Sequence, residues 1–293
     1  MPLRITVDVF SGRPNPVIEL DGREADEALA RLRPARALAA NETPPPVESR
    51  LGYRGLVVEQ VGARASNRLP RVFRAAGGSL LGERLGHRAE DEQFEESVLG
   101  PQGLIRRLQL GAPVMEFLAR ERVGLRDWQA IKWGKVIHWP VTLRCRCAPL
   151  YEPAWWNDGG TRQFNNNCYN YATNYRTDTF AQPGLAAGAM YSALTCAAVR
   201  PAAEVDDLVS EPKAANKCPK EGHLVALVIA PGIDFHWYRK GRNGYWTHKP
   251  GGTPATNLDN SGVTIPDPRT ADRGMYTDFC TFMVVMHGHV KIR

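Results

Sequence analysis

The sequence lacks the long apolar run that a membrane helix requires. No stretch approaches the roughly 20 consecutive apolar residues that cross a bilayer. The first nine residues, Met-Pro-Leu-Arg-Ile-Thr-Val-Asp-Val, alternate like a strand and have none of the continuous apolar core of a signal peptide. The chain as given is therefore expected to start in the cytoplasm, unless a dedicated secretion apparatus exports it.

A concentrated tract of one charge sign is also missing. The formal net charge is +6 over 293 residues, and the arginines of the first half alternate with acidic residues. Proteins that bind nucleic acid usually gather lysine and arginine on one face. We therefore expect a solvated surface and no nucleic-acid partner, with mild affinity for an anionic partner or cell envelope left open.

Cysteine is absent from the first half of the chain. Six cysteines follow, at 145, 147, 168, 196, 218 and 280. Cys145 and Cys147 are closer than the paired cysteines of a usual zinc site, and no second close pair follows. We expect no metal and no cofactor, while an oxidising setting would allow one or two disulfides. If Cys168 is a free nucleophile, five cysteines remain, so at least one other thiol must be free.

The length and the hydrophobic content of 43% suffice for one large or two small domains. Residues 1–125 are predicted to form a small α+β domain for targeting or gating. This prediction rests on a hairpin with turn formers at 11–16, on further strand-like segments and on amphipathic helices. The predicted strands are 3–10, 17–20, 53–61 and 71–74. The predicted helices are 23–32, 90–98 and 114–122. This half carries no catalytic constellation.

Tryptophan is dense in residues 126–150, which we assign as an aromatic connector, and residues 151–293 as a second domain. In this domain helices are followed by an antiparallel sheet, an α+β arrangement. The predicted helices are 168–176 and 186–198, and the predicted strands are 222–229, 233–239, 245–249 and 279–286.

A polar tract leads into a single cysteine in the second domain. Residues 163–173 are Gln-Phe-Asn-Asn-Asn-Cys-Tyr-Asn-Tyr-Ala-Thr. Asparagine side chains cap helices, so Cys168 is expected at the head of a short helix, where the helix dipole favours the thiolate. A structural cysteine buried beside Tyr169 and Tyr171 is the alternative. A nearby base would favour the nucleophile.

Two histidines downstream can supply that base and its orienting group. His236 lies in an alternating segment, and a hairpin loop with an Asn-Gly signal follows it. Thr247 or His248 should lie opposite His236, to within one or two residues. We therefore expect His236 and His248 as neighbours on one face. Cys168, His236 and His248 would then be nucleophile, base and orienting residue.

This order resembles papain-like cysteine hydrolases, most closely the NlpC/P60 class. In that class a cysteine-bearing helix is followed by a Gly-Asp-Leu-Val type strand, a strand with the base histidine, and a strand ending in His-Ala-Pro-Gly. The corresponding segments here are Glu-Gly-His-Leu-Val at 221–225, His-Trp-Tyr-Arg at 236–239 and Trp-Thr-His-Lys-Pro-Gly at 246–251. The resemblance spans roughly residues 150–290 and implies a papain-like fold with His236 as the base.

The chain also departs from that class. Asn167 and Tyr169 flank Cys168 where Asp and Ser are usual, and His223 stands where Asp is common. His223 is the reserve base, although a structural role is commoner for such a histidine. Gln163 is placed like the oxyanion-donating glutamine of some papain-like enzymes. The segments at 167–172, 234–239 and 246–252 also resemble bacterial proteins and insoluble molluscan shell-matrix proteins without a settled activity.

The expected function is cleavage or transfer of an amide bond through a Cys168 thioester. The resemblance suggests peptidoglycan peptides as substrates. It fits an exported effector, with a secretion-apparatus or immunity-protein partner, or an intracellular peptidase. Tyr169, Trp237, Trp246 and Lys249 would contact the substrate. The alternative is a non-catalytic papain-like binding module whose aromatic cleft grips a peptide or glycan.

Overall fold

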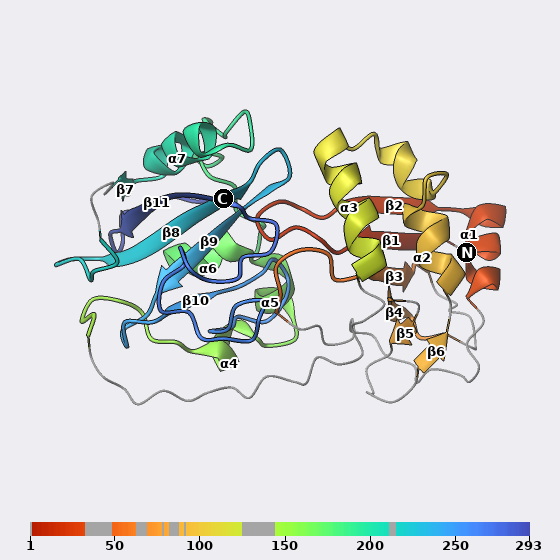
Figure 1. The fold of residues 1–293 in the computed structure, drawn as a ribbon, viewed down its shortest axis with the longest axis horizontal. Coiled ribbons are helices and arrows are strands. Elements are labelled where there is room, and N and C mark those ends of the chain that lie inside the picture. The colour runs from red at the N-terminus through yellow and green to blue at the C-terminus, as the bar shows by residue number, and fades with distance from the viewer. Residues whose placement is uncertain are drawn as a thin grey trace. The chain divides into compact units, whose positions relative to one another are not determined.

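The computed structural model describes residues 2–32, 49–62, 69–77, 79–81, 88–90, 92–124, 144–210 and 215–293. It divides into two compact units. Unit 1 comprises Met1–Val9, Asn15–Val47 and Tyr53–Lys132, and unit 2 comprises Phe10–Pro14, Glu48–Gly52 and Trp133–Arg293. Each unit combines helices with a sheet, and every strand pairing described is antiparallel (Figure 1). The protein is therefore of the α+β class.

Unit 1 is built on a six-stranded sheet in the order β2-β1-β3-β4-β5-β6. Its strands are β1 Leu3–Val7, β2 Val17–Leu20, β3 Leu56–Gln60, β4 Val72–Ala76, β5 Ser79–Leu81 and β6 Arg88–Glu90. Its helices are α1 Gly22–Arg31, α2 Glu92–Leu99, the 3-10 helix η1 Leu104–Leu108 and α3 Ala112–Gly124. Alternate residues of β1 are buried, as predicted. Helix α2 packs on β4 and contacts α1 and α3.

A buried carboxylate follows β1 in unit 1. Asp8 Oδ1 accepts from Arg54 Nη2 at 2.6 Å, and Asp8 Oδ2 accepts from Arg74 Nη1 at 2.9 Å. Burial alone would raise the pKa of Asp8, but the two guanidiniums outweigh it and lower that pKa to about 2. Its three members are far apart along the chain, so no local pattern in the sequence predicted this cluster.

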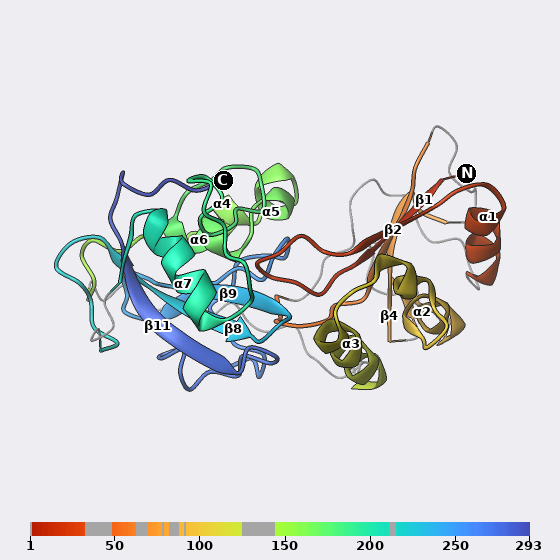
Figure 2. The ribbon, with the colours of Figure 1, turned by 90° about the horizontal axis from the view of Figure 1, so that it is seen from above.

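Unit 2 is built on a five-stranded sheet in the order β10-β9-β8-β11-β7. The strands are β7 Leu208–Ser210, β8 His223–Ala230, β9 Asp234–Lys240, β10 Trp246–His248 and β11 Asp278–Val285. The helices are α4 Pro153–Trp156, α5 Thr161–Asn165, α6 Cys168–Thr173 and α7 Cys196–Val205. Figure 2 shows α7 lying along the sheet, where it contacts β7, β8 and β11. Residues of α6 and α7 share one buried cluster with alternate residues of β8 and β9.

Several predicted elements of the second half need correction. The helix expected over 186–198 begins only at Cys196, where the Thr195 side chain accepts from the Ala198 N–H and caps it. Helix α6 ends at Thr173, because Asn174 adopts the left-handed conformation (φ 57°). Strand β7 was not predicted. Most of the predicted connector 126–150 and the loop 33–50 lie outside the described residues.

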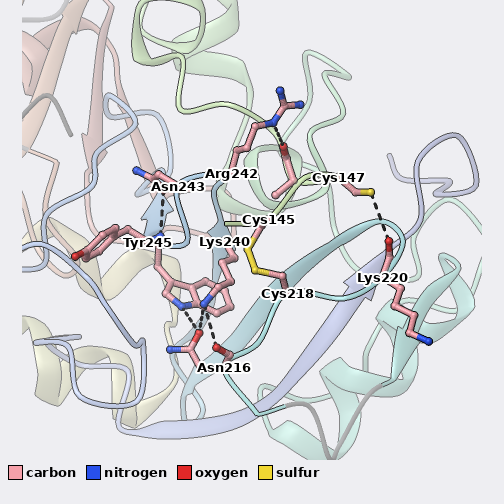
Figure 3. The surroundings of a disulfide bond; sticks show 11 residues. Cys145, Cys147, Asn216, Cys218, Lys220, Lys240, Arg242, Asn243 and Tyr245 are labelled. Atoms are coloured by element: carbon pink, nitrogen blue, oxygen red, sulfur yellow. Dashed lines mark hydrogen bonds between the residues drawn. A yellow bond between two sulfur atoms is a disulfide. The ribbon is translucent and has the colours of Figure 1, made fainter. Parts of the chain in front are cut away.

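The six cysteines form two disulfides and leave two thiols. Cys145 bonds Cys218, and Cys196 bonds Cys280. Figure 3 shows the first bond, with Cys147 Sγ directed at the carbonyl oxygen of Lys220. Cys147 is exposed and Cys168 is buried. The prediction that a free Cys168 entails another free thiol is confirmed.

Candidate functional site

Cys168 begins helix α6, as the polar tract predicted. The Asn167 side chain accepts from the N–H groups of Tyr169 and Asn170 at 3.0 and 3.1 Å. Asn170 Oδ1 accepts from the Asn167 N–H at 3.0 Å, which completes a reciprocal capping box. The asparagines therefore fix where the helix starts and place the thiol in its first turn.

The Cys168 thiol is fully buried rather than open to solvent. It belongs to a core cluster that includes Tyr169, Phe235 and Trp237. Burial and the Asp234 carboxylate raise the pKa of the thiol well above its usual value, and the backbone N–H of Trp237 and the Lys249 ammonium only partly counteract them. The direction of this pKa shift is opposite to the one expected from the helix terminus.

The two histidines form the pair that the sequence predicted. Strands β9 and β10 pair Tyr238 with His248, so His248 is displaced by two residues from the position opposite His236. Both imidazoles project from the same face as Tyr238. His236 Nε2 lies 2.9 Å from His248 Nδ1. The prediction that they are neighbours on one face is confirmed.

The hydrogen bonds of this pair assign its tautomers. His248 Nε2 lies 2.9 Å from the carbonyl oxygen of Leu258, which can only accept, so Nε2 carries the proton. Burial lowers the pKa of His248 to about 4, so near neutral pH its Nδ1 is an acceptor. His236 Nε2 must then donate to it. A neutral His236 consequently holds its lone pair on Nδ1, and that nitrogen is the basic one.

The thiol and the histidine pair both adjoin strand β9. The N–H of Trp237, which favours the Cys168 thiolate, belongs to the residue that follows His236. The pairing of β9 with β10 ends at Tyr238, so His236 and Trp237 of β9 lie beyond the residues paired with β10. Trp237 and Phe235 point into the core with Cys168, and His236 leaves the strand on the other face. The thiol and His236 therefore adjoin the same stretch of β9 from its two faces.

A segment from the start of the chain also contributes to this site. Phe10–Pro14 belongs to unit 2, and the Ser11 carbonyl oxygen accepts from the backbone N–H of Cys168 at 3.4 Å. Asp234 accepts from the N–H groups of Ser11, Gly12 and Arg13 at 2.6, 3.2 and 3.1 Å. The sequence of residues 11–16 predicted only a turn.

Gln163 and Lys249 have structural partners. Gln163 Oε1 accepts from the Gly159 N–H at 3.2 Å and stabilises the start of α5. Lys249 was expected to contact substrate, but it is fully buried. Its Nζ donates to the carbonyl oxygens of Gln163, Asn166 and Gly251 at 2.5, 2.6 and 2.5 Å. Lys249 therefore ties the loop that precedes α6 to the end of β10, a positioning role.

The aromatic residues predicted to line a cleft lie in the interior. Tyr169, Trp237 and Trp246 are all 0% exposed. The Tyr169 and Trp237 ring centroids are 5.3 Å apart, and the Tyr169 hydroxyl donates to Asp206 at 2.8 Å. The prediction that these three rings contact a substrate is wrong for this structure, because Tyr169 and Trp237 pack in the core between α6 and the sheet and Trp246 stacks on Phe282.

The reserve base, His223, is occupied at the other end of α6. Its Nε2 lies 2.7 Å from the Ala172 carbonyl oxygen, so Nε2 donates, and Nδ1 lies 3.3 Å from His287 Nε2. Burial lowers the pKa of His223 to about 3. Since Ala172 is a full turn beyond Cys168, His223 anchors the C-terminal end of the helix. The structural interpretation is the better one.

These buried imidazoles make the stability of unit 2 sensitive to acid. Their folded pKa values, about 4 for His248 and about 3 for His223, lie below the unfolded value of roughly 6.5. The unfolded chain therefore binds more protons below pH 6.5, and stability falls as the pH decreases from there. Asp206, whose pKa burial raises to about 6, acts in the opposite direction.

We expect His223→Gln to reduce the loss of unfolding free energy between pH 7 and pH 5 by about 2 kcal/mol, because glutamine does not titrate. Urea titrations at both pH values measure this difference. His289→Gln, at an exposed position, is the control and should leave the pH dependence unchanged. An equal pH dependence in His223→Gln and the wild type would contradict the assignment.

Comparison with known proteins gives one relative. The chain is 47% identical over 141 residues to insoluble matrix shell protein 1 of Ruditapes philippinarum, an alignment that covers 91% of that protein and 47% of this chain. The chain belongs to the family of insoluble matrix shell protein 1. No family model matches the chain, and no solved structure matches it. This similarity shows that the two proteins share a domain, and it gives no role to any residue of the candidate site.

No helix within the described residues is long and apolar enough to cross a membrane.

Proposed function

We propose that unit 2 is a cysteine hydrolase of papain-like, NlpC/P60-like type that cleaves or transfers an amide bond through Cys168. The observation that carries this is the relay from His236 through His248 to the Leu258 carbonyl oxygen. It leaves Nδ1 of His236 as the basic nitrogen, one residue before Trp237, whose backbone N–H favours the Cys168 thiolate. A base oriented through its second nitrogen is what an unactivated thiol requires.

The proposed reaction uses groups of this chain only. His236 Nδ1 takes the proton from Cys168 Sγ, and the thiolate attacks the substrate carbonyl carbon. The Cys168 backbone N–H would stabilise the oxyanion. As the carbon–nitrogen bond breaks, His236 returns the proton to the leaving amine, and water or a second amine then releases the acyl group from sulfur. His248 keeps the His236 ring in position.

Two further features support the setting of this proposal. A helix bearing a cysteine, followed by an antiparallel sheet bearing two histidines, is the order expected for papain-like hydrolases. The two disulfides fit an oxidising compartment, as an exported effector would meet. Peptidoglycan peptides are the substrate class that we propose on the resemblance alone.

The test is the pH profile of Cys168 alkylation by iodoacetamide, followed by peptide mass mapping. We expect the rate to rise in a step near the pKa of an imidazole, well below the usual thiol value of about 8.5, and to lose that step in His236→Ala. His248→Ala should shift the step, because the ring of His236 loses its orientation. A Cys168 alkylation rate that rises only above about pH 8.5, and does so equally in His236→Ala, would contradict the proposed hydrolase.

A second candidate is a non-catalytic matrix or binding domain. It is favoured by the name of the relative, insoluble matrix shell protein 1, and by the burial of Cys168. Since the three rings proposed as an aromatic cleft are buried, such a domain would bind through other surface residues. The same pH profile separates the candidates, because a purely structural thiol has no need of an imidazole.

A further inference from the structure

The segment Phe10–Pro14 occupies the position at Cys168 that an acyl substrate would need. Its Ser11 carbonyl oxygen accepts from the Cys168 backbone N–H, the donor to which the proposed mechanism assigns the oxyanion. Ser11 is 0% exposed, as is Cys168. A peptide carbonyl of the chain itself therefore sits at the reacting end of the site.

The backbone of this segment is held by hydrogen bonds to several side chains. The Gly12 carbonyl oxygen accepts from Asn167 Nδ2 at 2.7 Å and from Gln182 Nε2 at 2.8 Å. Asp234 accepts from the three consecutive N–H groups described above, and Tyr276 donates to the same carboxylate at 2.6 Å. These contacts recognise main-chain groups of a bent segment, because three consecutive N–H groups converge on one carboxylate.

The space around Gly12 restricts which residue this segment can carry there. A Cβ atom built on Gly12 would overlap the Phe235 ring, and Phe235 is itself buried in the core cluster. The residue after the acyl group must therefore lack a side chain. Arg13 adds one side-chain bond, from Nη1 to the Ile233 carbonyl oxygen at 2.8 Å.

We propose that Phe10–Pro14 is a pseudosubstrate segment that keeps Cys168 covered, and that the site it covers accepts peptides with glycine on the leaving-group side of the acyl residue. The inference rests on the proposed function for its chemistry, but the access that it predicts is measured independently. Cys168 reacts only when the segment leaves, so the closed form is latent.

The experiment compares absolute alkylation rates of the two free thiols in the intact chain. Exposed Cys147 is the internal standard, and we expect Cys168 to react far more slowly in the wild type. Gly12→Ala should raise the Cys168 rate about tenfold or more, because the added methyl group is overpacked against Phe235. Gly111→Ala is the matched control, since its Cβ would meet only Pro113 Cδ at 3.8 Å.

Two further measurements keep the result clear if Gly12→Ala unfolds. Arg13→Ala adds no bulk, removes the bond to Ile233, and should raise the Cys168 rate to a smaller extent. A synthetic peptide of residues 8–16 should protect Cys168 in either variant, and the same peptide with alanine at position 12 should not. Equal Cys168 alkylation rates in the wild type and both variants would overturn the proposal. Cleavage of the chain after Ser11 would also overturn it, because the segment would then be a substrate.

The two hypotheses fail in different ways. If Gly12→Ala exposes Cys168 but the pH profile of Cys168 alkylation does not depend on His236, the proposal of a covering segment is supported and the proposal of a hydrolase is contradicted. If the pH profile depends on His236 while neither variant changes the absolute rate of Cys168 alkylation, the proposal of a hydrolase is supported and the proposal of a covering segment is contradicted.

Discussion

Replacing Asp8 by alanine is expected to destabilise unit 1 by about 3–5 kcal/mol, the cost of leaving buried charges without a partner. Asp8 bonds two guanidiniums, and Arg54 and Arg74 are almost completely buried. Each arginine would keep its charge in a medium that solvates it poorly. The shift of the urea midpoint of unit 1, at unchanged m-value, measures the effect.

The matched control for Asp8 is Glu24, which makes a short ion pair with Arg107 at the surface of the same unit. Solvent screens that pair, so Glu24→Ala should leave the urea midpoint almost unchanged. A loss in Asp8→Ala no larger than that in Glu24→Ala would contradict the assignment of Asp8 as the centre of a buried charge cluster.

Removing the disulfide between Cys196 and Cys280, by changing both residues to alanine, is expected to cost unit 2 about 2–5 kcal/mol. The bond closes a separation of 84 residues and joins the first residue of α7 to β11. The register of β11 with β8 shifts between Phe279 and Thr281, so Cys280 is the extra residue of a bulge. Without the bond, α7 would keep only its apolar contacts with the sheet.

Thermal unfolding of unit 2 measures this loss, and Cys147→Ala is the control, because Cys147 is an exposed free thiol. The double variant should also become insensitive to a reductant at that site, whereas the wild type loses stability when reduced. Equal melting temperatures of the double variant and the control would show that the bond does not constrain the unfolded chain.

Local patterns in the sequence were sufficient for the elements around the site. Alternation predicted β8, β9 and β11 nearly at their observed bounds, since buried strands require apolar residues at every position or every second one. The asparagine tract predicted the start of α6, because a cap is made by neighbours in sequence. The pairing of His236 with His248 followed from the same local rules and a short hairpin.

The state of the site depended on contacts that no local pattern carries. The environment of Cys168 includes Ser11 and Asp234, which lie far from it in sequence. Burial of the thiol and the charge of Asp234 reverse the expected direction of the thiol pKa. The aromatic rings that suggested a cleft were equally compatible with a core, and only packing decided between these. Lys249 likewise changed from a surface residue to a buried cation bound by three carbonyl oxygens.

The sequence by itself determined the α+β class, the position of the cysteine at the head of a helix and the adjacency of the two histidines. The tertiary structure alone decided that the cysteine is covered, by a turn some 155 residues earlier in the chain whose Gly12 carbonyl oxygen binds Asn167. The physical reason is that hydrogen-bond partners within a turn or a helix are fixed by a few residues. The partners of a buried backbone carbonyl or thiol are fixed by whichever distant segment fills the space.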